Sequence, residues 1–354
     1  MKKEFRNLTE TEKMDLAAEH VFCRSEEEFV KYDVCTDCIN PETDEPLIRK
    51  DESTLTRFYA FRNNRIGYDA DASLEANIVY EKVFYPIINR LDEKRIRKQY
   101  DPEGKFNKYG LKYELGEPEC KGGLSYRGDT MNSVATTNRE YYWNHKEQHS
   151  NATGKEFPWP AEALRLIDTY HTMGNFMILP FRKDFSINQA RGCGMTKDYF
   201  DLYLLAVYNY YRMEAGQEPV YDVRLEHVLG YNRKLKWFFK FYLSMFIEED
   251  AWYPESHGQL VDDIEDNNIL RSQILPGWQS FVEKNLFQDF VDPNEYGQHG
   301  MPKELWTGHF SEYNAYNCKP KREEQFFEFW TNAADRIEKR SRRIYEKLQM
   351  EVFL

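Results

Sequence analysis

The sequence predicts a mainly α-helical protein with a small irregular or β element around residues 105–157, an α+β arrangement. Long stretches with helical spacing of apolar residues, a central segment of different composition and a high aromatic content all point this way. Aromatic residues make up 16% of the 354 residues, and their burial offsets the entropy lost when a backbone becomes ordered. We expect one compact domain over residues 1–354. Two domains, 1–155 and 156–354, are the alternative.

The N-terminal third carries several helical patterns. Thr9 and Glu12 have the spacing of a capping box, so a helix is expected from Thr9 towards Phe22. Residues 33–51 contain turn formers and two prolines and indicate a loop. Helix is expected again over 53–64. A longer helix is expected over 72–99, where apolar residues keep near-helical spacing despite an internal proline.

The central segment, residues 101–157, is rich in Gly, Asn, Thr and Tyr and has few helical signals. We expect loops there with short strands, for example around Lys112–Leu115 and Leu124–Tyr126. A helix should then start near Pro160, since proline suits a first helical turn, and end about His171. The short apolar run 177–179, which ends at a proline, predicts a buried strand.

Three further helices are predicted in the C-terminal half, over 197–214, 233–249 and roughly 320–350. The second is apolar on nearly all sides, which is typical of a central helix. The third is amphipathic, and its apolar stripe consists of Phe326, Phe329, Trp330, Ala333, Ile337, Ile344 and Leu348. Its other face alternates in charge, as solvated helix faces do.

The overall charge limits the classes of partner. A formal net charge of -12 argues against duplex nucleic acid, whose binding needs Lys and Arg to neutralise phosphates. It is compatible with a basic protein partner, which acidic patches at 248–250 and 262–266 would attract. No apolar run is long enough to span a membrane, and no secretory signal follows the first lysines. Six cysteines are too few for a disulfide framework, so we expect a cytoplasmic protein.

Polar side chains gather around glycine at three places between residues 126 and 201. The first place, 126–133, offers Arg127 as a planar fork for phosphate or carboxylate, Asp129 as a base or acceptor, and Asn132. The alternative interpretation is a turn in which Asp129 and Asn132 bond to neighbouring backbone amides.

The second place is His171-Thr172-Met173-Gly174-Asn175, directly after a predicted helix. The helix dipole would stabilise His171 as a cation that donates to an anion. The alternative is a simple helix C-cap, with Gly174 as its left-handed residue.

The third place runs from Asn188 to Gly194 and is followed by Asp198 and Asp201. Arg191 stands there between amides and glycines, which suits an anion. A structural bridge between Arg191 and Asp198 is the alternative.

Together the three places predict one pocket for a small anionic, nucleotide-like ligand, because loops on a rigid scaffold usually carry such sites. His171 and Asp129 would supply acid–base function, and no cofactor is identified. The predicted ligand-binding residues are Arg127, Asn132, Asn175, Asn188, Arg191 and Asp198. A non-catalytic acidic protein that engages a basic partner, as in phage–host conflict or toxin neutralisation, is the alternative function.

The same segments carry a resemblance. Residues 128–133 (GDTMNS), 187–192 (INQARG) and 340–344 (RSRRI) are similar to those of an uncharacterised family of bacterial proteins, over about 120–350. The family pattern has Arg-Phe-Asp where this chain has Tyr199-Phe200-Asp201. The resemblance groups the motifs and implies no activity.

Two further patterns are weaker. Cys35 and Cys38 have the spacing of a zinc or thiol-redox pair, which Cys23 and His20 could complete, although ordinary cysteines are the simpler interpretation. Arg165 and His171 have the loose spacing seen in HEPN ribonucleases, which are also helical. A HEPN-like ribonuclease is therefore a third functional hypothesis.

Overall fold

The computed structural model describes residues 9–22, 24–33, 74–84, 96–100, 111–115, 122–125, 129–131, 133–134, 137–142, 144–145, 158–182, 185–186, 199–229, 240, 242–244, 246–247, 274–314 and 319–352. Structural statements below concern these residues. The predicted helix at 53–64 lies outside them, and so does most of the predicted helix at 233–249. No helix in the described segments is both long and apolar enough to cross a membrane.

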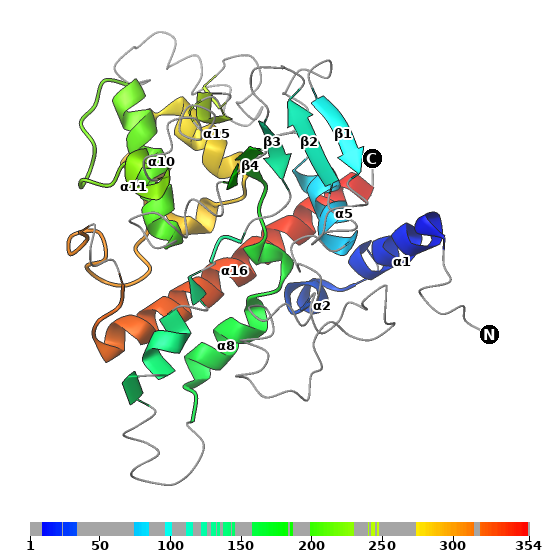
Figure 1. Cartoon of the computed structure of the whole chain (residues 1–354), viewed down its shortest axis with the longest axis horizontal. Helices are drawn as coiled ribbons and strands as arrows, with labels where there is room; N and C mark the ends of the chain where they lie inside the picture. Colours follow the sequence, from blue (N-terminus) through cyan, green and yellow to red (C-terminus); the bar gives the residue numbers. More distant parts are fainter. Residues whose placement is uncertain are drawn as a thin grey trace.

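A single long helix organises the fold. Helix α16 (Glu323–Val352) runs diagonally through the middle of the molecule, in red in Figure 1. Helices α8, α2 and α5 pack against it, together with two short 3₁₀ turns. A second helical group, in which α10 contacts α11 and α15, lies on the side of α16 away from α8 and α2. Further helical bounds are α1 Glu10–Phe22, α2 Glu26–Val30, α5 Leu74–Val83, α8 Ala161–Thr169, η3 Met173–Asn175, α10 Phe200–Glu214, α11 Leu225–Leu229, α15 Pro276–Lys284 and η6 Gln288–Phe290.

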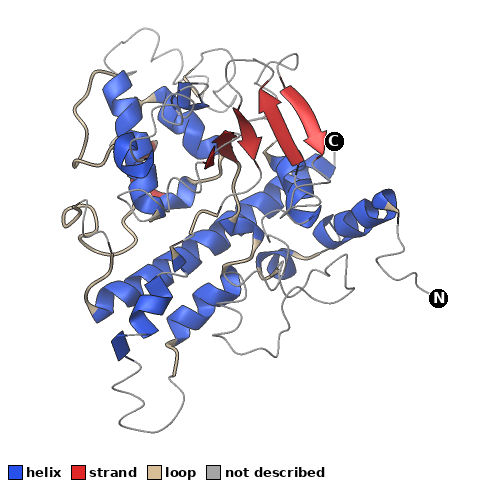
Figure 2. Cartoon of the chain, in the orientation of Figure 1, coloured by secondary structure: helices blue, strands red, loops and turns tan. Residues whose placement is uncertain are grey.

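A five-stranded antiparallel sheet of order β1-β2-β3-β4-β5 lies at one end of the molecule (Figure 2). It joins segments far apart in the chain, because β3 pairs with β4 across more than fifty residues. A small hairpin of β6 and β7 packs beside α10 and α15. The strands are β1 Ile96–Tyr100, β2 Leu111–Leu115, β3 Gly122–Ser125, β4 Leu179–Arg182, β5 Phe185–Ser186, β6 Val291–Pro293 and β7 His299–Pro302.

The predicted fold class is confirmed: the protein is mainly helical and has a small β element. The capping box at the start of α1 forms, since the Glu12 side chain accepts from the Thr9 amide at 2.7 Å and Thr9 Oγ1 accepts from the Glu12 amide. Strands β2 and β3 fall where strands were expected. The apolar run at 177–179 is buried, but the strand itself starts at Leu179.

Two boundaries differ from the predictions. The helix expected over 72–99 covers 74–83 as α5, whereas Ile96–Tyr100 forms strand β1. Pairing of β1 with β2, from Ile96 opposite Leu115 to Tyr100 opposite Leu111, fixes that strand through non-local hydrogen bonds that override local periodicity. Residues 137–142, expected to be irregular, are helical, and Tyr141 packs edge-on against Trp330 of α16.

The core is continuous through the described residues, from Ala17 to Leu348. All seven residues of the predicted α16 stripe are buried, which confirms that face. The buried face is not wholly apolar, because Arg340, three residues after Ile337 and four before Ile344, lies on it and is buried, as is Arg336 at its edge. A core shared by N- and C-terminal helices favours a single domain, which stays a prediction.

Candidate functional site

Two of the three predicted polar places lie side by side. Asp129 forms an antiparallel β-bridge with Phe176, and the Thr130 amide donates to the Asn175 carbonyl at 2.6 Å. The pairing of β3 with β4 continues this contact. The segments around 129 and 175 therefore meet. The predicted pocket also needs the third place, 188–194, which lies outside the described residues, so the shared pocket stays a prediction.

Asn175 holds these two segments together. Its Oδ1 accepts from Thr130 Oγ1 at 2.7 Å and from the Met131 amide at 2.9 Å, and its Nδ2 donates to the Tyr170 carbonyl at 2.8 Å. The side chain is fully buried. An amide with these three bonds fixes the chain path, so the geometry gives Asn175 a structural role. Its predicted contact with a ligand stays a prediction.

Gly174 is required by close packing and not by a left-handed conformation. The cap of α8 is Tyr170, in the right-handed region, and Gly174 belongs to η3. A Cβ at position 174 would lie 2.0 Å from the Ile337 carbonyl oxygen and 2.4 Å from Ser341 Oγ. Ser341 Oγ accepts from the Gly174 amide at 2.9 Å. The alternative interpretation, a C-cap with a left-handed Gly174, is therefore wrong, and the glycine lets the 171–175 loop lie directly on α16.

Arg340 completes this attachment. Its Nη1 donates to the carbonyls of Gly174 at 2.8 Å and Phe176 at 2.6 Å, and its Nε donates to the Asn285 carbonyl at 3.0 Å. The guanidinium stacks over Phe287 and is completely buried. Burial lowers the pKa of Arg340 to about 9. Within the described segments its Nη2 has no hydrogen-bond partner.

The two residues predicted to be catalytic face the interior. His171 is 6% exposed and Asp129 is 4% exposed. His171 Nδ1 lies 3.9 Å from Asp33 Oδ1, whereas Asp129 Oδ2 accepts from the Tyr170 hydroxyl at 3.5 Å. Solvent therefore reaches neither group readily, and their catalytic role stays a prediction.

The HEPN-like pairing of Arg165 with His171 is not a shared site in this geometry. Arg165 is exposed on α8 and forms two hydrogen bonds with Glu338, both of 3.0 Å. His171 is buried against Asp33. One of the two groups faces the surface and the other faces the core, which disfavours joint action on RNA.

Several predicted residues lie outside the described segments: Arg127, Asn132, Asn188, Arg191 and Asp198, together with Cys35, Cys38 and the acidic patches at 248–250 and 262–266. Their contribution to a site stays a prediction. In the part of the chain that is described, no group of three or more His, Cys, Asp or Glu side chains is arranged to hold a metal ion.

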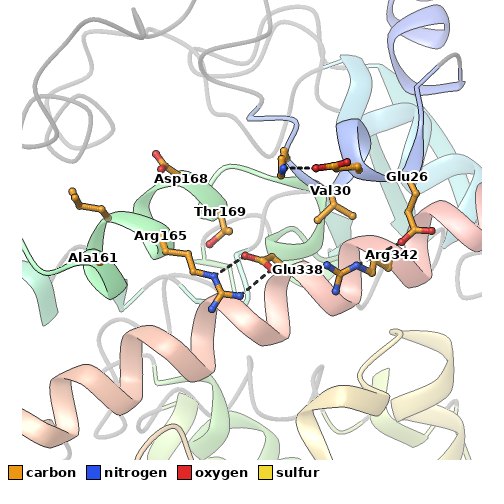
Figure 3. A pocket seen from close by; sticks show the side chains of 11 residues that line it. Glu26, Val30, Ala161, Arg165, Asp168, Thr169, Glu338 and Arg342 are labelled. Carbon is orange, nitrogen blue, oxygen red and sulfur yellow. Dashed lines mark hydrogen bonds and ion pairs between the residues drawn. The ribbon is translucent and has the colours of Figure 1, made fainter.

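A groove of about 890 Å³ lies between α2, α8 and α16 (Figure 3). This volume falls in the range of roughly 300–1,000 Å³ that is typical of small-ligand sites. Val30, Ala161 and Leu164 give it apolar surface, and charged side chains surround them. The charged lining residues are Glu26, Glu27, Lys31, Arg165, Asp168, Glu338 and Arg342.

The two arginines of the groove differ in how firmly they are held. Arg165 binds Glu338 through two hydrogen bonds and also lies 2.6 Å from Asp335 Oδ1. These contacts, led by the hydrogen bond to Glu338, raise the pKa of Arg165. Arg342 has one carboxylate contact among the described residues, at 3.6 Å between its Nε and Glu26 Oε1, and no hydrogen bond to any of them. In Figure 3, Arg165 reaches towards Glu338 and Arg342 towards Glu26.

Arg342 was missed because its neighbours suggest an ordinary charged face. The available signal was its place one turn after Glu338, since residues four apart share one side of a helix. Glu338 binds α8 and Arg342 faces α2, so this side of α16 borders two other helices.

A second missed feature is a buried acid–histidine pair. Asp201 Oδ2 accepts from the Leu305 amide at 2.8 Å and lies 2.5 Å from His309 Nδ1, and the His309 ring stacks on Trp306. Both partners of the pair are buried. The nearby Asp201 partly offsets the effect of burial on Arg336, whose pKa is nevertheless lowered to about 10. This cluster joins α10 to the 305–309 loop.

Comparison with known proteins gives one match. No curated protein and no solved structure matches the chain. The predicted likeness to an uncharacterised family is confirmed for the central segment, which contains α8, η3, α10 and α11 but neither α2 nor α16. Residues 121–257 match the sequence model of a family described only as a family of unknown function, DUF6994.

Proposed function

We propose that this protein binds a small organic ligand that carries an anionic group, and that the groove between α2, α8 and α16 is the binding site. The observation that carries the proposal is the groove itself: about 890 Å³ in volume, with aliphatic surface and an arginine on its rim that lacks a hydrogen bond to the described residues. Pockets of this kind combine apolar area with a few orienting polar groups.

Arg342 is the groove cation best suited to the anionic group. A guanidinium binds carboxylate or phosphate through two parallel hydrogen bonds. The fork of Arg165 is already engaged by Glu338 and Asp335, and Lys31 is paired with Glu27 one turn away. Glu26 is half exposed, so it can move aside when an anion reaches Arg342.

The proposal keeps the predicted ligand class and moves its main contact to α16. The 171–175 loop then stabilises the site from the other side of α16, because Arg340 and Ser341 form hydrogen bonds with it. Arg342 lines the groove. Sites on rigid elements hold their geometry better than sites on loops. The predicted roles of Arg127 and Arg191 can be tested in the same assay.

Thermal unfolding with a ligand panel tests the proposal. The panel contains nucleoside monophosphates, sugar phosphates and small organic carboxylates. A ligand present at 100 times its dissociation constant should stabilise the protein by about 2.7 kcal/mol. We expect Arg342→Ala to remove this stabilisation.

Arg322→Ala is the matched control. Arg322 has a side chain exposed to 50%, compared with 47% for Arg342, and it also contacts exposed glutamates, but it does not line the groove. A stabilisation that survives in Arg342→Ala, or that disappears equally in Arg322→Ala, contradicts the proposed site. Stabilisation by none of the three compound classes contradicts the proposed function.

A further inference from the structure

We infer that the ligand of this groove is an aliphatic monocarboxylate, with its carboxylate on Arg342 and its alkyl chain along α8. The inference rests on the proposed function and narrows the ligand class. It replaces the nucleotide-like ligand that the sequence suggested with a compound that has an alkyl chain and no base.

The described lining of the groove lacks two types of side chain that commonly recognise a nucleobase. Aromatic rings stack on bases and amide side chains bond to their edges, alongside Arg, Asp and Glu. Among the described residues that line the groove there is no aromatic ring, Asn or Gln. The apolar lining is aliphatic, from Val30, Ala161 and Leu164, which suits a saturated chain.

The shape of the groove also suits an extended chain. Lining residues on α8 run from Ala161 to Thr169, a distance of about 12 Å at the rise of an α-helix. On α16 the lining runs from Glu338 to Arg342 and places the arginine at the α2 side. A ligand bound at Arg342 can therefore extend over Val30 towards Leu164.

The charges of the rim favour a head group with a single negative charge. Among the described residues that line the groove, four are acidic and three are basic, so a doubly charged phosphate meets more repulsion than a carboxylate does. Glu338 is held by Arg165 and cannot readily turn away, whereas Glu26 lies 3.6 Å from Arg342 without a hydrogen bond.

Titration calorimetry with a homologous series tests the inference. The probes are hexanoate, octanoate and decanoate, with octylamine, octyl phosphate and adenosine monophosphate as comparison compounds. Affinity should increase up to about 15-fold for each added pair of methylene groups that becomes buried. Octylamine should not bind, and octyl phosphate and adenosine monophosphate should bind at least tenfold more weakly than octanoate.

Two variants test where the alkyl chain and the carboxylate of the ligand bind. Arg342→Ala should weaken the binding of all three fatty acids by a similar factor. Leu164→Ala should reduce the gain in affinity for each added methylene group. Leu164→Ala keeps a good helix former in α8, so the fold should be retained. Met213→Ala, which truncates an exposed apolar side chain on α10, is the control and should change neither quantity.

The outcomes separate the inference from the proposed function. If adenosine monophosphate binds through Arg342 and chain length has no effect, the aliphatic ligand is excluded and the proposed function stands. If octyl phosphate binds more tightly than octanoate, the head group is assigned wrongly. If octylamine binds as well as octanoate, or if no compound binds, both the inference and the proposed function fail.

Discussion

Arg340 and Arg342 stand two residues apart on the same helix and have opposite environments. Arg340 is fully buried, donates to three backbone carbonyls and stacks on an aromatic ring. The Arg342 side chain is 47% exposed and has one loose contact, with Glu26. Two positions along an α-helix point about 200° apart, so one arginine faces the 171–175 loop and the other faces the groove.

The two arginines have different roles: the charge of Arg340 holds the fold together, and the charge of Arg342 is accessible to a ligand. A buried arginine that binds main-chain oxygens fixes how elements pack, because buried carbonyls need hydrogen-bond donors. An arginine at a groove rim retains its donors for a ligand. Helix α16 uses both in one turn: its inner side holds the polar loop that follows α8, and its outer side borders the groove between α2 and α8.

The largest expected effect is that of Arg340→Ala. It removes the donors to Gly174, Phe176 and Asn285 and leaves a cavity, so the free energy of unfolding should fall by about 3–5 kcal/mol. Urea unfolding with an unchanged m-value measures this loss. A change below about 1 kcal/mol would show that the inner side of α16 is not held by this residue.

Conservative replacements of Arg340 and Arg342 should differ in their effect on stability in the same way. Arg340→Lys keeps the charge but cannot reach three carbonyls with one ammonium group, so a loss of at least about 2 kcal/mol should remain. Arg340→Met should not rescue stability either, since the carbonyl acceptors stay buried. Arg342→Lys, in contrast, should leave stability unchanged.

Gly174→Ala tests the contact between the loop and α16 from the other partner. The new Cβ would overlap the Ile337 carbonyl oxygen, a backbone atom that cannot rotate away. Shifting the loop costs about 1–3 kcal/mol or more, as overpacking does elsewhere. Gly216→Ala is a poor control because its φ is 75°. Ala163→Gly removes a fully buried methyl group and weakens α8 without a clash, so it should cost about 1–2 kcal/mol.

A loss for Gly174→Ala no larger than that for Ala163→Gly would mean that the loop and α16 are not in the close contact described. Unfolding followed by tryptophan fluorescence reports both variants, since Trp330 lies within α16 and is buried.

Ser341→Ala should have an intermediate effect. Ser341 Oγ accepts from the Gly174 amide, and both groups are buried. Without the hydroxyl, the amide stays buried and unpaired, which costs about 1–2 kcal/mol. Ser311→Ala, on an exposed hydroxyl that donates to the Gly308 carbonyl, is the control and should change stability by less than about 0.5 kcal/mol. Equal losses of stability in the two variants would show that Ser341 does not help to hold the 171–175 loop on α16.

Short-range spacing in the sequence predicted the elements whose formation depends on residues close together in the chain. The capping box at Thr9, the apolar stripe of α16 and the strands at β2 and β3 all follow from short-range spacing. Strand β1 was missed because its identity depends on β2, which lies more than ten residues further along the chain. The polar composition of the segments around 129 and 175 predicted that they lie close together. It did not predict that their backbones pair.

The candidate groove could not be predicted in the same way. Its walls come from α2, α8 and α16, which are separated by more than a hundred residues each, and α2 is only five residues long. Helical spacing places Arg340 on the buried face of α16, between Ile337 and Ile344. It does not show which distant carbonyls the buried guanidinium groups of Arg336 and Arg340 bind.

Arg342→Ala is expected to have the smallest effect on stability and the most selective effect on binding. An exposed ion pair such as Arg342–Glu26 contributes about 0–1 kcal/mol, so unfolding should match that of Arg322→Ala within about 0.5 kcal/mol. Binding should differ sharply between the two variants, because Arg342 lines the groove and Arg322 does not. Urea unfolding and ligand titration on the same protein samples measure both quantities. A large loss of stability in Arg342→Ala would make this arginine a second structural residue like Arg340, and the contrast between the two sides of α16 would then fail.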